Sequence, residues 1–199
     1  MGRRGGKTML AINELAKFSV KPKQRVLALY STFSQAKNTI WTELLERLYD
    51  KNWIKKVNQS DLTITLKNDS KIFVKSSDNR EALRGTRYDF IVLDECADLH
   101  KDVWTTICRP MLADSGGHAL FIGTPKGRGN WFYDLFVKAG SEQEWNTHQY
   151  TTLDGGWVTP EEIESAKRDM DEREFRQEFL AEWQDYSGII YHAFSEDNI

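Results

Sequence analysis

Two kinds of apolar pattern alternate along this chain of 199 residues, and together they predict an α/β fold. Near-continuous apolar runs, typical of strands buried on both faces of a parallel sheet, occupy three segments. Segments with apolar residues every three or four positions, which predict helices, lie between them. The predicted buried strands are 25–31, 90–93 and 119–123, and the predicted helices are 9–18, 34–51, 101–112, 130–138, a helix beginning at Thr159, and 172–183.

Two further segments read as strands of a different kind. Residues 62–66 alternate cleanly between apolar and polar, and a polar turn separates them from a second strand at 71–75, which predicts a β-hairpin with one wet face. Residues 148–152 predict one more strand. Because buried strands alternate with helices, we expect a mostly parallel sheet flanked by helices, with the hairpin as an insertion.

Composition narrows the class of protein without identifying it. The chain is 40% hydrophobic, enough for one substantial core with an appendage. No apolar run approaches the roughly 18 residues of a membrane span, and no signal peptide opens the chain. Cys96 and Cys108 are too few for a disulfide framework, which favours a reducing, cytosolic setting.

The net charge of −3 hides an uneven distribution. Residues 1–25 carry seven Lys or Arg against the single acid Glu14, whereas residues 154–185 carry eleven Asp or Glu against four Lys or Arg. A basic amino-terminal region suits a polyanionic ligand such as a nucleotide or DNA. Solvated surface is the equally weighted alternative for any single charge.

The first eight residues, Met1-Gly-Arg-Arg-Gly-Gly-Lys-Thr8, have the pattern of a phosphate-binding loop. Such a loop wraps backbone N–H groups around a phosphate at a helix N-terminus, so Gly2, Gly5 and Gly6 are candidate nucleotide contacts. Lys7 would reach the terminal phosphates, and the Thr8 hydroxyl would hold Mg²⁺. The common pattern has a glycine where this chain has Met1, and a basic tail is the alternative.

Asp94 and Glu95 directly follow the apolar run 90–93. A parallel strand delivers such residues to the sheet edge where ligands bind. Asp94 would hold Mg²⁺ through water, opposite Thr8, and Glu95 would polarise the attacking water as general base. The alternative is a solvated strand end.

Arginines and one threonine complete the candidate site. Arg3 and Arg4 lie within the loop, and Arg84 precedes the acidic strand. One guanidinium on the γ-phosphate oxygens is worth roughly 10³–10⁵ in rate, so Arg3 and Arg84 are candidate catalytic residues. Thr124 ends the strand at 119–123 and would sense the γ-phosphate; a simple chain turn is the alternative.

The order of these motifs resembles the ATPase domain of a large terminase subunit, the motor that packages DNA into tailed-phage heads. Gly-Arg-Arg-Gly-Gly-Lys-Thr, Ile-Val-Leu-Asp-Glu and the run ending Gly-Thr-Pro carry the resemblance. It extends to Ala-Leu-Arg-Gly at 82–85 and to the Phe-x-x-Glu-Phe helix beginning near Glu174.

The resemblance implies a P-loop ATPase fold of the RecA-like class, with ATP and Mg²⁺ as cofactors. It implies Lys7 and Thr8 on phosphate and magnesium, Asp94 on the metal, Glu95 as catalytic carboxylate and Thr124 in the coupling motif. Arg3 is placed like an arginine finger acting in cis, and Arg84 like one offered to a neighbouring subunit of a ring; the two compete for one role.

The resemblance also implies partners and boundaries. Double-stranded DNA, a small terminase subunit and a portal protein are the expected partners of a homo-oligomeric ring in the host cytoplasm, with no membrane association. We expect an ATPase core at 1–152, a helical appendage at 153–187 and, at 188–199, the start of a linker. Family members have an upstream first strand and a carboxy-terminal nuclease, so this chain is expected to be the central portion of a longer protein and to lack nuclease activity.

Two other functions fit the sequence. A helicase would share the same core, although the sequence offers no second motor domain. A prophage remnant would bind nucleotide or DNA without turnover.

Overall fold

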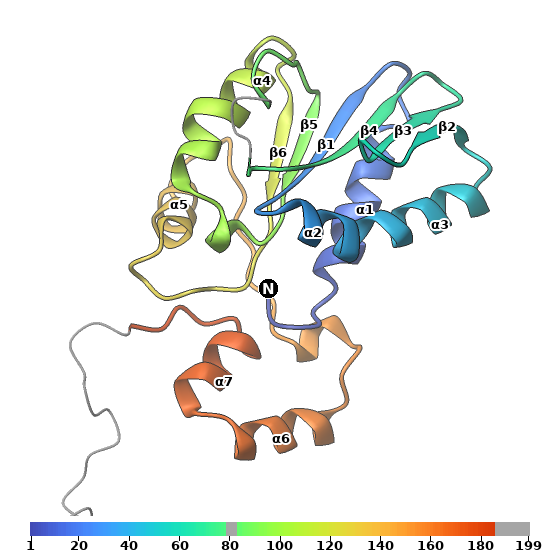
Figure 1. Ribbon diagram of the computed structural model, residues 1–199. Coiled ribbons are helices and arrows are strands. Elements are labelled where there is room, and N and C mark those ends of the chain that lie inside the picture. Colours follow the sequence, from blue (N-terminus) through green and yellow to red (C-terminus); the bar gives the residue numbers. More distant parts are fainter. Residues whose placement is uncertain (79–82, 186–199) are drawn as a thin grey trace, which may run out of the picture.

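The computed structural model describes residues 1–78 and 83–185. Its centre is a six-stranded sheet in the order β2-β3-β4-β1-β5-β6, with helices on both faces (Figure 1). β4, β1, β5 and β6 run parallel, and β2 and β3 pair antiparallel, so the mostly parallel α/β sheet expected from the sequence is confirmed. The strands are β1 (Arg25–Tyr30), β2 (Ile54–Asn58), β3 (Thr63–Leu66), β4 (Lys71–Ser76), β5 (Phe90–Leu93) and β6 (His118–Phe121).

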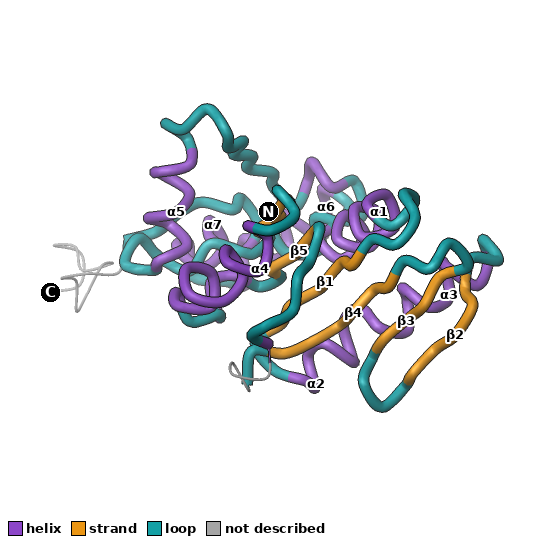
Figure 2. Tube along the Cα trace, turned by 90° about the horizontal axis from the view of Figure 1, so that it is seen from above, coloured by secondary structure: helices purple, strands orange, loops and turns teal. Residues whose placement is uncertain are grey.

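The helices cover the two faces of the sheet in separate groups. One group packs on one face; a second, with a π-helical stretch at Val103–Cys108, packs on the other, mainly over β5 and β6 (Figure 2). The first group is α1 (Lys7–Phe18), α2 (Phe33–Ala36) and α3 (Thr42–Asp50), and the second is α4 (Arg109–Ala113) and α5 (Trp131–Ala139).

β1 shows why its sequence reads as one continuous apolar run. Side chains alternate between the faces of a strand, so Val26, Ala28 and Tyr30 enter the core beneath the first group of helices. Leu27 and Leu29 enter the core on the opposite face. All five are buried, as a central strand of a covered sheet requires.

The carboxy-terminal part is an appendage of two helices, α6 (Pro160–Asp169) and α7 (Glu172–Glu178), which lie apart from the layered sheet and beside the amino terminus (Figure 1). The Thr159 hydroxyl accepts a hydrogen bond from the Glu162 N–H, so the predicted capping residue is confirmed. The predicted linker at 188–199 lies outside the described residues, as does Ala82.

Three expectations about elements were wrong, and one strand was missed. Residues 148–152 form no strand, because they make isolated hydrogen bonds to the amino-terminal loop and to the segment after α7. The helix expected to reach 183 ends at Glu178, before Ala181 adopts a left-handed backbone with φ 56°. The single helix expected at 34–51 is divided in two, because α2 begins after its capping residue Thr32 and a π-helical turn separates it from α3. β2 was not expected at all.

Candidate active site

The phosphate-binding loop leads directly into α1. Gly6 is the N-cap, with φ 86°, a left-handed conformation that glycine adopts without steric cost. Among the described residues, the backbone N–H groups of Gly6, Lys7 and Thr8 donate to no carbonyl oxygen. Free N–H groups at the positive end of a helix dipole form a binding site for an anion such as phosphate.

Lys7 connects this loop to the end of β6. Its Nζ donates to the Thr124 Oγ1 at 3.0 Å and to the Gly2 carbonyl oxygen at 3.2 Å. Thr124 is 6% exposed, so its hydroxyl is available only to groups inside the site. The structure therefore brings together the loop lysine and the threonine that the sequence places 117 residues further on.

Asp94 lies at the neighbouring strand end, after β5. It is 2% exposed, and both carboxylate oxygens accept hydrogen bonds, Oδ2 from the Tyr30 hydroxyl and Oδ1 from the Glu95 N–H, each at 2.9 Å. Burial raises the pKa of Asp94, while the hydrogen bond from Tyr30 and the charge of Lys7 lower it. Lys7 and Asp94 are therefore within electrostatic reach of each other.

Glu95 is half-buried and occupies a strained backbone position, with φ 48° and ψ 49°. A non-glycine residue in this region costs about 1–3 kcal/mol and is common at functional sites. Burial and the charge of Lys7 lower the pKa of the Met1 amine and the charge of Glu95 raises it, with a net result of about 6. Glu95 therefore lies near the start of the loop.

The loop arginines differ from the rest of the site in being exposed. Arg3 and Arg4 both present their side chains at the surface, and Arg4 has a left-handed backbone with φ 55°. Arg84 is also exposed, on the connection from β4 to β5, next to Gly85 with φ 79°. Its neighbours Leu83 and Thr86 line a surface hollow. No residue of the phosphate-binding loop lines this hollow.

The phosphate loop is hydrogen-bonded both to the segment near residue 150 and to the appendage. The Gly2 N–H donates to the Tyr150 carbonyl at 2.8 Å, and the Arg3 N–H donates to the Glu178 carbonyl at 2.6 Å. The buried Thr152 donates its hydroxyl to the Arg3 carbonyl at 2.7 Å. The loop is thus held between the segment near residue 150 and the end of α7.

Sequence reasoning missed three residues of this site: Tyr30, Thr152 and Trp157. Trp157 is 72% exposed, and a β-carbon built on Gly6 would lie 3.7 Å from its indole nitrogen. Only Tyr30 left a signal, since a phenol at the end of a buried run requires a hydrogen-bond partner. The aromatic side chains at the start of α5 pack within the protein, since the Phe132 ring lies edge-on to Trp183 and the Tyr133 ring is tilted against it.

The described residues contain no cluster of three or more His, Cys, Asp or Glu side chains able to hold a metal. Mg²⁺ is commonly bound by one or two carboxylates together with substrate phosphates, so a single Asp94 beside a phosphate loop fits that ion. In the described part of the chain, no helix is long and apolar enough to cross a membrane.

Over residues 1–197 the sequence matches the family described as "Terminase large subunit, T4likevirus-type, N-terminal". The chain belongs to this family. The large terminase subunit of Escherichia phage T5 is 30% identical over 201 residues, covering 98% of this chain and 45% of that protein. The large subunit of Thermus phage G20c is 32% identical over 132 residues, covering 59% of this chain and 27% of that protein.

Solved structures of large terminases share the fold. The ATPase domain from Thermus phage P74-26 matches with a TM-score of 0.78 and 25% identity, covering 92% of this chain and 86% of that domain. The large terminase of another thermophilic bacteriophage, in complex with ATP-γ-S, matches with a TM-score of 0.80 and 20% identity, covering 98% of this chain and 49% of that protein. This terminase chain spans about half the length of the T5 protein and of the terminase bound to ATP-γ-S.

A prediction follows for the hydrogen bond between Tyr30 and Asp94. Tyr30→Phe removes the only side-chain donor to this buried carboxylate among the described residues, so we expect the free energy of unfolding to fall by about 1–3 kcal/mol. Because the carboxylate also loses its orientation, nucleotide binding should need more Mg²⁺. Urea unfolding and Mg²⁺ titrations test both effects. Tyr49→Phe, at a tyrosine 60% exposed, is the control, and equal behaviour of the two variants would contradict the role of Tyr30.

Proposed function

We propose that this chain hydrolyses ATP and that hydrolysis powers the movement of double-stranded viral DNA into a procapsid. The hydrogen bond between Lys7 and Thr124 carries the proposal, because it joins the phosphate loop to the sheet edge that bears Asp94 and Glu95. Family membership supports a DNA-packaging motor in general. The large terminase of the thermophilic bacteriophage has been crystallised with ATP-γ-S and with ADP.

The loop binds the nucleotide in this proposal. The backbone N–H groups of Gly6, Lys7 and Thr8, which donate to no carbonyl oxygen among the described residues, would bind the phosphates, and the Lys7 ammonium would neutralise part of their charge. When nucleotide binds, the Lys7 Nζ would exchange the Thr124 hydroxyl for a γ-phosphate oxygen as its hydrogen-bond acceptor. The Thr124 hydroxyl then reports whether the γ-phosphate is present.

Asp94 and Glu95 supply the hydrolytic side of the site. Thr8 and Asp94 are the residues that would hold Mg²⁺, Asp94 through water, and the ion would supply positive charge to stabilise the phosphates. Glu95 accepts a proton from the attacking water as general base. The hydrogen bonds from Tyr30 and from the Glu95 N–H fix the Asp94 carboxylate in one orientation.

Two arginines are candidates for stabilising the transition-state charge. Arg3 lies in the loop itself and would act in cis. Arg84, exposed on the β4–β5 connection, would act on the site of a neighbouring subunit in a ring. We also propose three partners for such a ring: double-stranded DNA, a portal protein and the small terminase subunit. Assembly would take place in the host cytoplasm.

The division of the chain into parts is also proposed. Residues 1–152 form the ATPase core and residues 153–187 the helical appendage.

ATP turnover with and without duplex DNA tests the function. We expect wild-type turnover that duplex DNA stimulates and that Lys7→Ala and Glu95→Ala abolish. ATP binding without turnover would instead support a remnant, and stimulation by single strands with strand separation would support a helicase. Either result would overturn the packaging motor.

Mixing experiments separate the two arginines. If Arg84 acts in trans, inactive Arg84→Ala and inactive Glu95→Ala proteins should regain turnover when mixed, because one variant supplies the finger and the other an intact site. If Arg3 acts in cis, Arg3→Ala mixed with Glu95→Ala should stay inactive.

A further inference from the structure

A row of three cations and one threonine crosses four strands on one face of the sheet. Lys56 pairs with Thr65 across β2 and β3, Thr65 pairs with Lys71 across β3 and β4, and Lys71 pairs with Arg25 across β4 and β1. Directly paired residues point to the same face. With adjacent strands about 4.8 Å apart, the row is about 14 Å long. Lys75 lies four residues after Lys71 on β4, and it therefore points to the same face.

We call the surface formed by Arg25, Lys56, Lys71 and Lys75 the cationic face. Its residues alternate with Ile64, Leu66, Ile72 and Val74, which are buried on the other side beneath the first group of helices. Figure 2 shows α2 and α3 alongside β2–β4, whereas α4 and α5 lie on the side of β5. Lys56 and Lys71 are exposed, and Arg25 and Lys75 are half-buried.

These cations have no carboxylate in direct contact, although the charge of Lys71 helps to lower the pKa of Asp69. In the described part of the chain, none of the four forms an ion pair. Lys75 donates to the backbone carbonyl of Asp61 at 3.1 Å, and Arg25 donates its Nε–H to the Arg87 carbonyl at 3.0 Å. Residues 51–76 as a whole hold six lysines against two aspartates, Asp61 and Asp69. Asp69 is paired with Lys55, and the Asp61 carboxylate accepts from Asn58.

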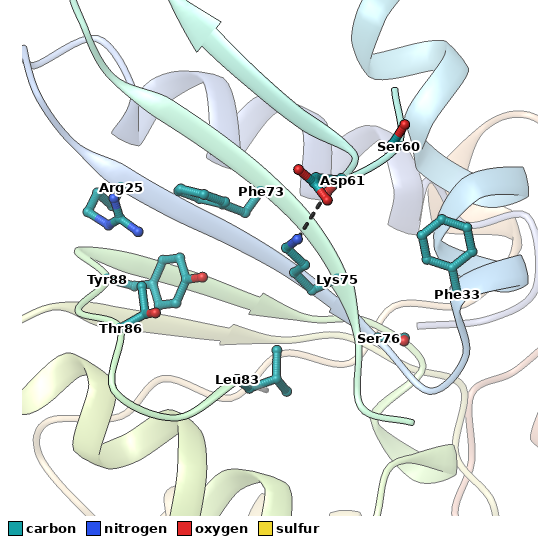
Figure 3. A pocket seen from close by; sticks show the side chains of 10 residues that line it. All are labelled: Arg25, Phe33, Ser60, Asp61, Phe73, Lys75, Ser76, Leu83, Thr86 and Tyr88. Carbon is teal, nitrogen blue, oxygen red and sulfur yellow. Dashed lines mark hydrogen bonds between the residues drawn. The ribbon is translucent and has the colours of Figure 1, made fainter. Parts of the chain in front are cut away.

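A hollow of about 470 Å³ opens at the β1 end of this face (Figure 3). The Arg25 guanidinium lies 4.7 Å from the ring centroid of Phe73 and 5.7 Å from that of Tyr88, so two rings hold it in place. Lys75 also lines the hollow, and Asp61 is the single acid in its lining. The hollow thus offers an oriented guanidinium and an ammonium beside aromatic surface.

We propose that the cationic face binds the phosphate backbone of duplex DNA. Three cations and a threonine in one row, with no carboxylate between them, match the negatively charged backbone of a polymer better than they match a protein surface of mixed charge. At 3.4 Å of axial rise per phosphate along one strand, the row spans about four base-pair steps. The choice of duplex DNA as the polyanion rests on the proposed packaging role.

Equilibrium binding of a labelled duplex of about 30 base pairs to the nucleotide-free chain tests the proposal, with Lys56→Ala/Lys71→Ala as the variant. Loss of two phosphate contacts should lower affinity about 10- to 60-fold at about 0.1 M salt and reduce the slope of log K against log salt by about two. The matched control is Lys37→Ala/Lys101→Ala, which removes two exposed lysines from helical segments outside the face. It should bind within about twofold of wild type.

The face is excluded if the Lys56/Lys71 variant binds DNA like the control, or if wild type does not bind the duplex. A variant that binds DNA normally but changes its sedimentation would instead identify the face as a contact between copies, which also overturns the proposal. Basal ATP turnover, measured without DNA, distinguishes a failure of the cationic face from a failure of the proposed function. Intact turnover with unchanged DNA binding overturns the face alone, whereas absent turnover with face-dependent binding overturns only the motor.

Discussion

Replacing Glu95 with Gln should lower kcat for ATP by about 10²- to 10⁴-fold while leaving nucleotide affinity within about twofold of wild type. The amide keeps the shape of the side chain and the left-handed backbone at φ 48°, but it cannot accept a proton from water. The loss should therefore fall on the chemical step alone. Steady-state turnover together with calorimetric titration of ATP separates kcat from binding.

Glu46→Gln is the matched control, because Glu46 is an exposed glutamate on α3, outside the candidate site. It should leave both quantities unchanged. A Glu95→Gln protein with near-normal kcat would show that another group accepts the proton, and one that fails to bind ATP would show that Glu95 has a structural role instead.

Gly2→Ala should displace the phosphate loop from Thr152 and from the end of α7. A β-carbon on Gly2 would lie 2.7 Å from the Phe179 carbonyl oxygen, from the Thr152 nitrogen and from the Thr152 hydroxyl oxygen. Two of these atoms are backbone, so the loop itself must move, at a cost of about 1–3 kcal/mol. The melting temperature should fall by roughly 2–4 °C for each kcal/mol. ATP affinity should fall as well, since Gly2 also accepts from Lys7.

Gly129→Ala provides the comparison, because a β-carbon there would meet no atom within 4 Å. Its melting temperature and ATP affinity should match wild type. If Gly2→Ala behaves the same way, the bonds between loop and appendage contribute nothing to stability or binding.

The buried elements could be predicted from the sequence because burial on both faces leaves a continuous apolar run. β5 was predicted to the residue, and β1 to within one residue. β2 was missed because Lys55 and Lys56 are adjacent charges at a register shift, where a bulge interrupts the alternation that reveals a strand. The segment at 148–152 was wrongly predicted as a strand. Its composition favours a strand, but no neighbouring strand pairs with it.

The candidate site was predictable where the chemistry is carried by a motif. Lys7 and Asp94 lie within electrostatic reach, as the order of strands in a parallel sheet leads one to expect. Tyr30, Thr152 and Trp157 could not be assigned, because contacts between positions far apart in the chain place them at the site. The cationic face was hidden for the same reason, since strand register rather than sequence order aligns Lys56, Lys71 and Arg25.

The most direct test of a shared nucleotide–metal site is calorimetric titration of ATP, with and without Mg²⁺, into wild type, Lys7→Ala and Asp94→Asn. If the phosphate loop and the end of β5 share one nucleotide–metal complex, Lys7→Ala weakens binding under both conditions. Asp94→Asn should remove only the additional affinity that Mg²⁺ confers. An Asp94→Asn protein that keeps the full Mg²⁺-dependent gain would contradict a shared site.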